Sequence, residues 1–390
     1  MNTLRQGILT LIKSAILDKE HPLPDGFLLE EAFPILKKHQ LIPIAYAGAL
    51  KCGIDNTLPI MQEMFKIYYK LLIRINHQFK EFRRISKAFD ENQIDYLPLK
   101  GLTINKLFPK PEYRCMGDLD IMIRMEQYEK IIPIMQSLGF EHKHESDHEL
   151  VWFTKNCYVE LHKRLIPSYN KDYYAFYGDG FTLASISEGT RYELSSNDEF
   201  IYLFTHFAKH YRDGGIGCRH IIDLWVYRRA CPDLDETYIS NQLKELQLYD
   251  FYKNICQLIR VWFEDASYDE RTAFIENYIF ESGSWGTLLN HNLSYAVKHS
   301  KKHEDITEYK KKEKWEVLFP NMDQMKKIYP FLPKAPFLLP IFWVHRWFAV
   351  LLFRRKNIKQ RIKKYQDTDI SHVQTFQDAL NYVGLDFNFK

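Results

Sequence analysis

The stretch RCMGDLDIMIR (Arg114–Arg124) places two aspartates one residue apart inside an apolar run. In a β-strand, side chains two positions apart share a face, so Asp118 and Asp120 would point one way and the apolar residues between and after them the other. Two like charges side by side are costly unless a cation lies between them, and hard ions such as Mg²⁺ prefer oxygen ligands. The stretch therefore predicts a strand that carries a metal site, with a solvated turn at the strand's end as the alternative.

The composition is that of a globular chain with room for two or more domains: 390 residues, 46% hydrophobic and 26% charged. The formal net charge of +3 does not by itself indicate a nucleic-acid binder. Six scattered cysteines without a CxxC pair indicate neither a zinc module nor a disulfide framework, and the first twenty residues lack the features of a signal peptide. These features predict a cytoplasmic protein.

One apolar segment, beginning at Ala335 and ending in a basic cluster, resembles a membrane span in composition. Pro340, His345 and Arg346 interrupt its apolar run, and neither half reaches the roughly 20 residues that a bilayer requires. We therefore expect no transmembrane span but a helix packed on the protein. Weak contact of residues 337–364 with a membrane surface is the alternative.

The pattern of apolar residues divides the chain into three regions. Residues 1–92 and 191–390 show helical periodicity, which includes one long amphipathic helix that ends near Asn92. Residues 93–190 alternate between strand and helix patterns. There we expect strands in IDYLPLKG and at 118–123, a helix at 127–138, and a hairpin in ELVWFTKNCYVELHKRL. The predicted fold class is α+β, with a small mixed sheet between helical regions.

Two further features of this central region point to phosphate chemistry. Gly101, in LPLKG, lies at a strand–helix junction, where the backbone can approach a phosphate closely and Lys100 can add positive charge. Glu160 lies mid-strand in CYVELHKRL, and it meets Asp118 and Asp120 if the two strands are neighbours. Three carboxylates can hold two Mg²⁺ ions for phosphoryl or nucleotidyl transfer. A tight turn with an exposed lysine is the structural alternative for Lys100 and Gly101.

The order of these parts resembles the nucleotidyltransferase superfamily that includes DNA polymerase β. More closely, LKG, then R-x-M-G-D-x-D, then E-L-H resembles an uncharacterised bacterial nucleotidyltransferase family over residues 97–165, and more weakly over HFAKHYRDGGIGCRHIIDLW. This resemblance implies that Asp118, Asp120 and Glu160 are the catalytic metal ligands. It also implies that Gly101 is the phosphate-loop glycine and that Gly117 belongs to the nucleotide site.

The chain departs from the superfamily pattern after Gly101. A serine that contacts the phosphates usually follows this glycine, whereas Leu102 follows it here. Thr103 or Lys100 are candidates to replace that serine. Arg114 is a further candidate phosphate ligand, because a guanidinium binds phosphate through two hydrogen bonds. A surface ion pair is the alternative for Arg114.

The C-terminal region adds a candidate pocket. His206 and His210 are four residues apart on one predicted helix, and Arg219 and Asp223 are four apart on the next. They either line a nucleotide or acceptor pocket or bond two packed helices together. A zinc site is disfavoured, because no third ligand has a recognisable spacing. His162, two residues after Glu160, either orients that acid or is structural.

We therefore expect a nucleotidyltransferase that uses Mg²⁺, with two ions in preference to one and Mn²⁺ as a substitute. It would move a nucleoside monophosphate from a nucleoside triphosphate to a hydroxyl of an unknown acceptor, a small molecule or protein in preference to a long nucleic acid. The main alternative is an inactive module of the same fold that binds a nucleotide or a protein. A further alternative is a phosphohydrolase that uses the histidine-rich helix.

Overall fold

The computed structural model describes residues 2–299, 315, 318–326, 328–353 and 370–386. The chain forms two compact units. The first comprises residues 1–211, 215–286 and 383–390, and the second comprises residues 212–214 and 287–382. The first unit thus combines the N-terminal helices, the sheet and several helices of the region that follows it, where the sequence pattern suggested three separate regions.

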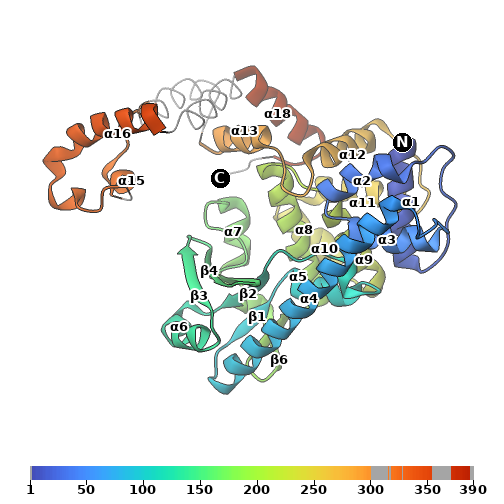
Figure 1. Ribbon diagram of the computed structural model, residues 1–390, viewed down its shortest axis with the longest axis horizontal. Coiled ribbons are helices and arrows are strands. Elements are labelled where there is room, and N and C mark those ends of the chain that lie inside the picture. Colours follow the sequence, from blue (N-terminus) through green and yellow to red (C-terminus); the bar gives the residue numbers. More distant parts are fainter. Residues whose placement is uncertain (1, 300–314, 316–317, 327, 354–369, 387–390) are drawn as a thin grey trace. The chain divides into compact units, whose positions relative to one another are not determined.

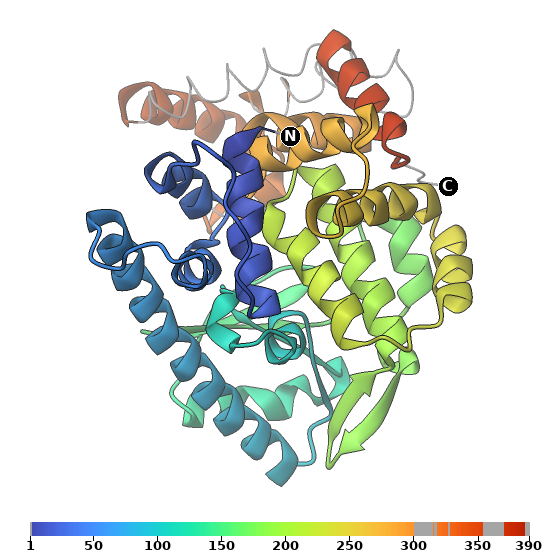
Figure 2. The same cartoon turned by 90° about the vertical axis from the view of Figure 1, so that its right-hand side faces the viewer.

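Four helices precede the sheet: α1 (Thr3–Leu17), α2 (Leu29–Lys38), α3 (Ile42–Lys51) and α4 (Pro59–Glu91). Asn2 caps α1 by accepting hydrogen bonds from the backbone of its first turn. α1 packs so closely on α3 that a Cβ atom at Gly48 would overlap the Leu11 carbonyl. The long helix α4, visible in Figures 1 and 2, confirms the amphipathic helix predicted to end near Asn92.

A seven-stranded mixed sheet follows, with the order β3-β4-β5-β2-β1-β7-β6. Its strands are β1 (Tyr96–Pro98), β2 (Leu119–Ile123), β3 (Glu141–Glu145), β4 (Glu149–Thr154), β5 (Cys157–His162), β6 (Ala184–Glu188) and β7 (Arg191–Leu194). β2 pairs in parallel with β5 and β1 with β7, while the other pairs are antiparallel. The α+β class and the β4–β5 hairpin are confirmed.

The sequence analysis missed β3, β6 and β7. β3 and β6 form the two edges of the sheet, and every side chain of β3, EHKHE, is exposed. No apolar alternation marks such strands, because neither of their faces is buried. Short helical segments join the strands: α5 (Gly101–Ile104), α6 (Tyr128–Ser137) and α7 (Lys171–Tyr177), with single turns at Asn105–Leu107, Pro111–Tyr113, Met125–Gln127 and Phe181–Leu183.

One face of the sheet is the core predicted from the apolar positions of the Asp-x-Asp strand. Leu119, Ile121 and Ile123 are fully buried there, together with Ile85 of α4 and Ile131 of α6. Two helices therefore cover this face. The alternate residues of β2, which include Asp120, belong to the opposite face, so the pleat of one strand separates the core from the polar positions.

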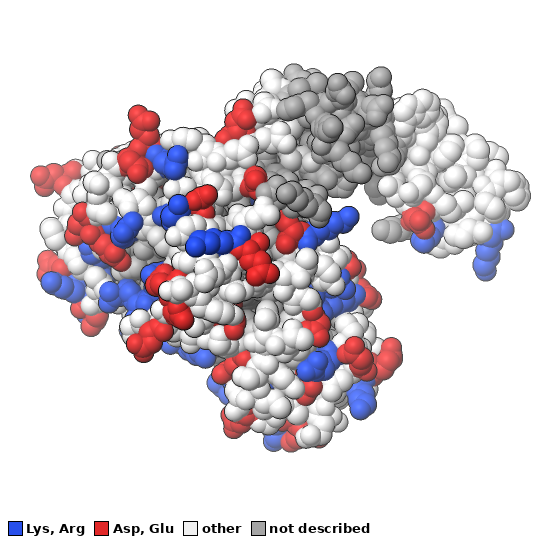
Figure 3. All heavy atoms as spheres, turned by 180° about the vertical axis from the view of Figure 1, so that it is seen from behind, with Lys and Arg blue, Asp and Glu red and all other residues white. Residues whose placement is uncertain are grey.

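The remaining helices of the first unit are α8 (Ser196–Asp213), α9 (Cys218–Ala230), α10 (Glu236–Glu245), α11 (Tyr249–Phe263) and α12 (Glu270–Ser282). α8 begins at Ser196, so the first residues of the region 191–390, for which helices were expected, form β7 instead. Figure 3 shows acidic and basic side chains interspersed on one face of the molecule, without a field of one sign.

The second unit contains α13 (Leu288–His299), α15 (Met322–Met325), α16 (Leu339–Phe353) and α18 (Ile370–Tyr382), with single turns at Leu332–Lys334 and Pro336–Leu338. Among the described residues, no helix combines the length and apolarity that crossing a bilayer requires. α16 forms part of the segment 337–364, for which membrane-surface contact was the alternative. Residues 354–364 of that segment lie outside the described residues.

Candidate active site

The register of two parallel strands brings the predicted acids together. In the β2–β5 pair Asp120 lies opposite Glu160, so their side chains share one face of the sheet. Asp118 immediately precedes β2 and forms a hydrogen bond with Glu160. A ligand oxygen from each of Asp120 and Glu160 lies within 4.8 Å of the other and of a His162 ring nitrogen. The parallel pairing of β2 and β5 therefore brings the acids together, as the sequence analysis expected for the case in which the two strands are neighbours.

Two donors hold one oxygen of Asp120. Nζ of Lys100 lies 2.6 Å from Oδ1, and Nε2 of His162 lies 2.7 Å from the same atom. Lys100 reaches this oxygen from the turn between β1 and α5, where its backbone adopts φ 47°. Such a conformation is uncommon for a residue with a Cβ atom. The lysine predicted to bind phosphate thus forms a buried ion pair with a predicted metal ligand.

Burial and the charges around the cluster give the three carboxyl groups different pKa values. Burial opposes ionisation of Asp120, but Lys100 and His162 outweigh it and hold the pKa of Asp120 well below its usual range. Burial, reinforced by the charges of Asp118 and Asp120, raises the pKa of Glu160 to about 9. Burial and the charge of Asp120 also raise the pKa of Asp118. Without a cation, Asp118 and Glu160 therefore share a proton at neutral pH.

A cleft of about 660 Å³ opens beside Asp118 and Glu160. Its basic side chains come from three elements: Lys37 of α2, Arg74 of α4 and Lys143 of β3. Its other lining residues include Ile42, Pro43, Ile67, Leu71, Cys115, Val151, Tyr158 and Trp285. The volume falls within the roughly 300–1,000 Å³ of small-molecule sites. The N-terminal helices thus supply one wall of the candidate site.

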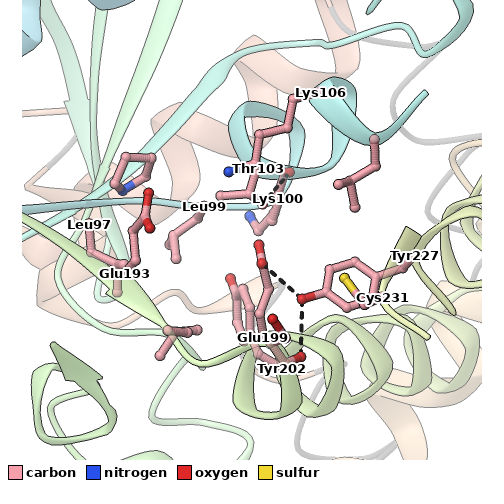
Figure 4. Close-up of a pocket in the computed structure, with 14 residues that line it drawn as sticks. Leu97, Leu99, Lys100, Thr103, Lys106, Glu193, Glu199, Tyr202, Tyr227 and Cys231 are labelled. Carbon is pink, nitrogen blue, oxygen red and sulfur yellow. Dashed lines mark hydrogen bonds between the residues drawn. The ribbon is translucent and has the colours of Figure 1, made fainter. Parts of the chain in front are cut away.

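A smaller cavity of about 210 Å³ lies next to Lys100, and Figure 4 shows its lining. Thr103 and Lys106 contribute from the α5 side, and Glu199 and Tyr202 contribute from α8. The Glu199 carboxylate accepts a hydrogen bond of 3.0 Å from the Tyr227 hydroxyl. The Tyr202 hydroxyl is buried and has no hydrogen-bond partner among the described residues.

With this geometry in view, comparison with known proteins identifies the family. Residues 26–264 match the model of a family described as uncharacterised nucleotidyltransferase. The chain belongs to this family. The match includes α2, α3 and α4 as well as the sheet, and so the residues named above for the large cleft except Trp285.

The solution structure of the antibiotic-resistance factor ANT(2'')-Ia is similar to this chain with a TM-score of 0.31 and 13% sequence identity. The similar region covers 49% of the present chain and 99% of the other. No curated protein matches the chain.

The glycines and threonine of the predicted phosphate site are placed as follows. Gly101 packs so tightly that a Cβ atom there would lie 2.8 Å from the Met116 side chain and 3.1 Å from Arg114. Gly117 is exposed, and its carbonyl accepts a 2.5 Å hydrogen bond from Arg74. The Thr103 hydroxyl donates to the Lys100 carbonyl at 2.9 Å. Close packing against Met116 and Arg114 therefore favours glycine at position 101.

The buried Arg114 has a protein partner. It donates to both carboxylate oxygens of Asp223, at 2.7 and 2.9 Å, and both side chains are less than a tenth exposed. The alternative of a surface ion pair for Arg114 is therefore wrong, because the pair is buried. Asp223 of α9 pairs with a residue of the segment before β2 and not with a residue of its own helix. Arg219, one turn earlier in α9, donates to Gln40 and to the Cys115 carbonyl.

His206 and His210 lie on α8 with their rings 4.4 Å apart. Burial, followed by the neighbouring His210, lowers the pKa of His206 well below its usual value. Two groups of three possible metal ligands occur among the described residues: one is Asp120, Glu160 and His162, and the other is His148, Glu149 and His162. Neither group contains His206 or His210, so the described part of the chain gives no support to a zinc site there.

Sequence reasoning missed several residues of the site. His148 contacts His162, Tyr202 lies near Lys100, and Arg74 lines the cleft from α4. Only His148 could have been found from the sequence. The predicted β4–β5 hairpin places Glu149 opposite His162, so its neighbour His148 also lies close to His162. Tyr202 and Arg74 come from distant helices, whose packing against the sheet no local pattern encodes.

Proposed function

We propose that this protein transfers a nucleoside monophosphate from a nucleoside triphosphate to a hydroxyl group of an acceptor. The observation that carries the proposal is the convergence of Asp118, Asp120 and Glu160 at the edge of a basic cleft, in a member of a nucleotidyltransferase family. The acceptor oxygen forms a bond to the α-phosphorus and the bond to pyrophosphate breaks. Glu160, which lines the cleft beside Asp118, would accept the hydroxyl proton once a cation has displaced its own.

The three acids fit a divalent cation. Asp118 and Glu160 share a proton that a cation can replace. Lys100 and His162 both donate to Oδ1 of Asp120, so Oδ2 accepts no hydrogen bond from either of them. Mg²⁺ or Mn²⁺, as one or two ions on these residues, would supply positive charge to the triphosphate and to the developing negative charge of the reaction. Lys100 and His162 meanwhile keep Asp120 ionised and oriented.

The large cleft suits the triphosphate donor. Lys37, Arg74 and Lys143 provide positive charge from separate elements, and Trp285, which is 73% exposed, offers an aromatic face at the same cleft. Base–aromatic stacking contributes about 1–3 kcal/mol per base. The mixed surface charge and the net charge of +3 favour a small molecule or protein over a long nucleic acid as the acceptor.

Labelled nucleotides test the proposal. Each nucleoside triphosphate, labelled at the α- or at the γ-phosphate, is incubated with Mg²⁺ and supplied separately with a small-molecule pool, a protein pool and an oligonucleotide. Nucleotidyl transfer moves the α-label to the acceptor and releases the γ-label as pyrophosphate, whereas a phosphohydrolase releases inorganic phosphate. Absence of both α-label transfer and metal-dependent triphosphate binding would contradict the proposal.

Arg74→Ala should weaken triphosphate binding at least about tenfold, because a hydrogen bond to a charged group contributes about 1.5–3 kcal/mol. The rate at saturating nucleotide should fall as well, because Arg74 also donates to the carbonyl of Gly117, which directly precedes Asp118. Calorimetric titration and initial rates measure the two effects. Arg83→Ala is the matched control, because Arg83 is an exposed arginine of the same helix that does not line the cleft. Equal effects of both variants would contradict the assignment.

Metal affinity should rise with pH. The raised pKa of Glu160, about 9, means that a cation must displace a proton at neutral pH. The Mn²⁺ affinity, measured by electron paramagnetic resonance, should therefore increase by about tenfold per pH unit from pH 6.5 to 8.5 and level off above pH 9. Glu160→Gln, which binds Mn²⁺ more weakly, should show a much shallower slope. A flat profile in the wild type would contradict the shared proton.

One observation favours a second candidate, an inactive nucleotide-binding module. The Lys100 ammonium already neutralises Asp120 and could replace a cation there. This candidate predicts triphosphate binding that needs no metal and produces no α-label transfer. Metal-dependent binding would exclude it.

A further inference from the structure

His148 continues a chain of polar groups that begins at Asp120. It lies directly before β4, and its Nε2 atom is 3.0 Å from Nδ1 of His162. The other nitrogen of His162, Nε2, is 2.7 Å from Oδ1 of Asp120. The two rings meet edge to face, with centroids 4.7 Å apart and planes at 70°. Carboxylate, imidazole and imidazole are thus connected in series in the interior of the protein.

The chemistry of these groups sets the direction of both hydrogen bonds. An ionised carboxylate only accepts, so the hydrogen of His162 must be on Nε2. A second hydrogen on Nδ1 would make His162 cationic, which is unfavourable because the ring is only 1% exposed and the Lys100 ammonium contacts the same Asp120 oxygen. Nδ1 of His162 is therefore an acceptor, and Nε2–H of His148 is its donor.

The far side of His148 supports this assignment. Its Nδ1 atom is buried and has no hydrogen-bond partner among the described residues. If the hydrogen of His148 were on Nδ1, a buried donor would lack an acceptor, and two lone pairs would face each other across 3.0 Å. Placing the hydrogen on Nε2 removes both problems, at the cost of one unpaired acceptor.

We propose that His148 is a positioning residue for the metal site. By donating to Nδ1 of His162, it adds a second contact to the one with Asp120, holds the His162 ring with its Nε2–H on Oδ1 of Asp120, and so leaves Oδ2 of Asp120 for a cation. The proposal rests on the proposed function only in its claim about the cation. The hydrogen bond between His148 and His162 is a property of the metal-free protein.

Three substitutions at position 148 distinguish the loss of the hydrogen-bond donor from the loss of side-chain packing. Glutamine carries an amide NH₂ close to the place of Nε2, asparagine ends near the place of Nδ1, and leucine has no donor. His148→Leu and His148→Asn should leave the hydrogen of His162 on Nε2 but remove the hydrogen bond to Nδ1, which shifts the ¹⁵N signal of Nδ1. They should also weaken Mn²⁺ binding by about 10-fold or more, the usual effect of losing a partner of a metal ligand. His148→Gln should retain this hydrogen bond and most of the affinity.

The readouts are the ¹⁵N shifts of the His162 ring in metal-free, ¹⁵N-histidine-labelled protein and the Mn²⁺ affinity by electron paramagnetic resonance. The His162 signals are assigned by their loss in His162→Gln, and thermal unfolding verifies that each variant folds. An unchanged ¹⁵N shift of Nδ1 of His162 in His148→Leu would overturn the inference, as would equal losses of affinity in His148→Gln and His148→Leu. Failure to transfer nucleotide would refute the proposed function but leave the ¹⁵N result intact.

Discussion

Asp118→Asn should abolish metal-dependent nucleotidyl transfer, with a loss of about 10³-fold or more, while the protein remains folded. The amide cannot share a proton with Glu160 or present a negative oxygen to a cation, so the group that offsets the charge of the triphosphate is lost. The rate of α-label transfer at saturating Mg²⁺ measures the effect.

The stability of Asp118→Asn should equal or exceed that of the wild type. Asp118 is only half buried, and Lys100 pairs with Asp120 instead, so the substitution leaves no buried cation without a partner. It also removes one of the charges that disfavour ionisation of Glu160. Glu141→Gln, on an exposed edge strand of the same sheet, is the matched control for loss of an acid. Residual transfer above a tenth of the wild-type rate would exclude Asp118 from the catalytic group.

Asp223→Asn should lower the free energy of unfolding by about 3–5 kcal/mol, because it leaves the buried Arg114 guanidinium without a counter-charge. The pair joins the segment before β2 to α9, so its loss loosens the support of the Asp-x-Asp strand. For a unit of this size the thermal midpoint should fall by about 10 °C. Differential scanning calorimetry measures the shift.

The double variant Arg114→Met/Asp223→Leu separates an unpaired charge from lost packing. Replacing both partners by apolar side chains removes the unpaired charge, so most of the lost stability should return. An equal loss in the single and double variants would show that packing or shape matters more than the ion pair. The double variant also tests Arg114 as a phosphate ligand, since near-normal triphosphate binding without the guanidinium would remove that role.

The parts of the fold that the sequence predicted are those with a buried face. The 33-residue helix α4 carries an apolar stripe with the period of a helix, and β2, LDIMI, is a short apolar run that is buried throughout. The edge strands β3 and β6 were missed because their side chains are mostly exposed, so burial imposes no pattern on them. Periodicity reports which face is buried, and it therefore fails where no face is buried.

Prediction of the candidate site from the sequence is limited in a similar way. The sequence predicted that Asp118, Asp120 and Glu160 meet if their strands are neighbours, and the parallel register fulfils that condition. The sequence could not give the partner of Arg114, which lies 109 positions away at Asp223. Nor could the sequence show that the Lys100 ammonium, predicted to bind phosphate, lies 2.6 Å from the Asp120 carboxylate. Residue type limits the chemistry of a side chain, whereas tertiary packing selects its partner.

The backbone of Lys100 has a thermodynamic consequence. At φ 47° and ψ −108°, a residue with a Cβ atom stores about 1–3 kcal/mol of strain that glycine would largely avoid. The chain has a lysine at this point, where glycine would give a more relaxed turn but no ammonium beside Asp120. Lys100→Gly would relieve this strain, but it would leave the buried Asp120 carboxylate with His162 as its remaining partner. Breaking a buried ion pair costs more than the strain, so the pair with Asp120 outweighs the backbone preference for glycine at position 100.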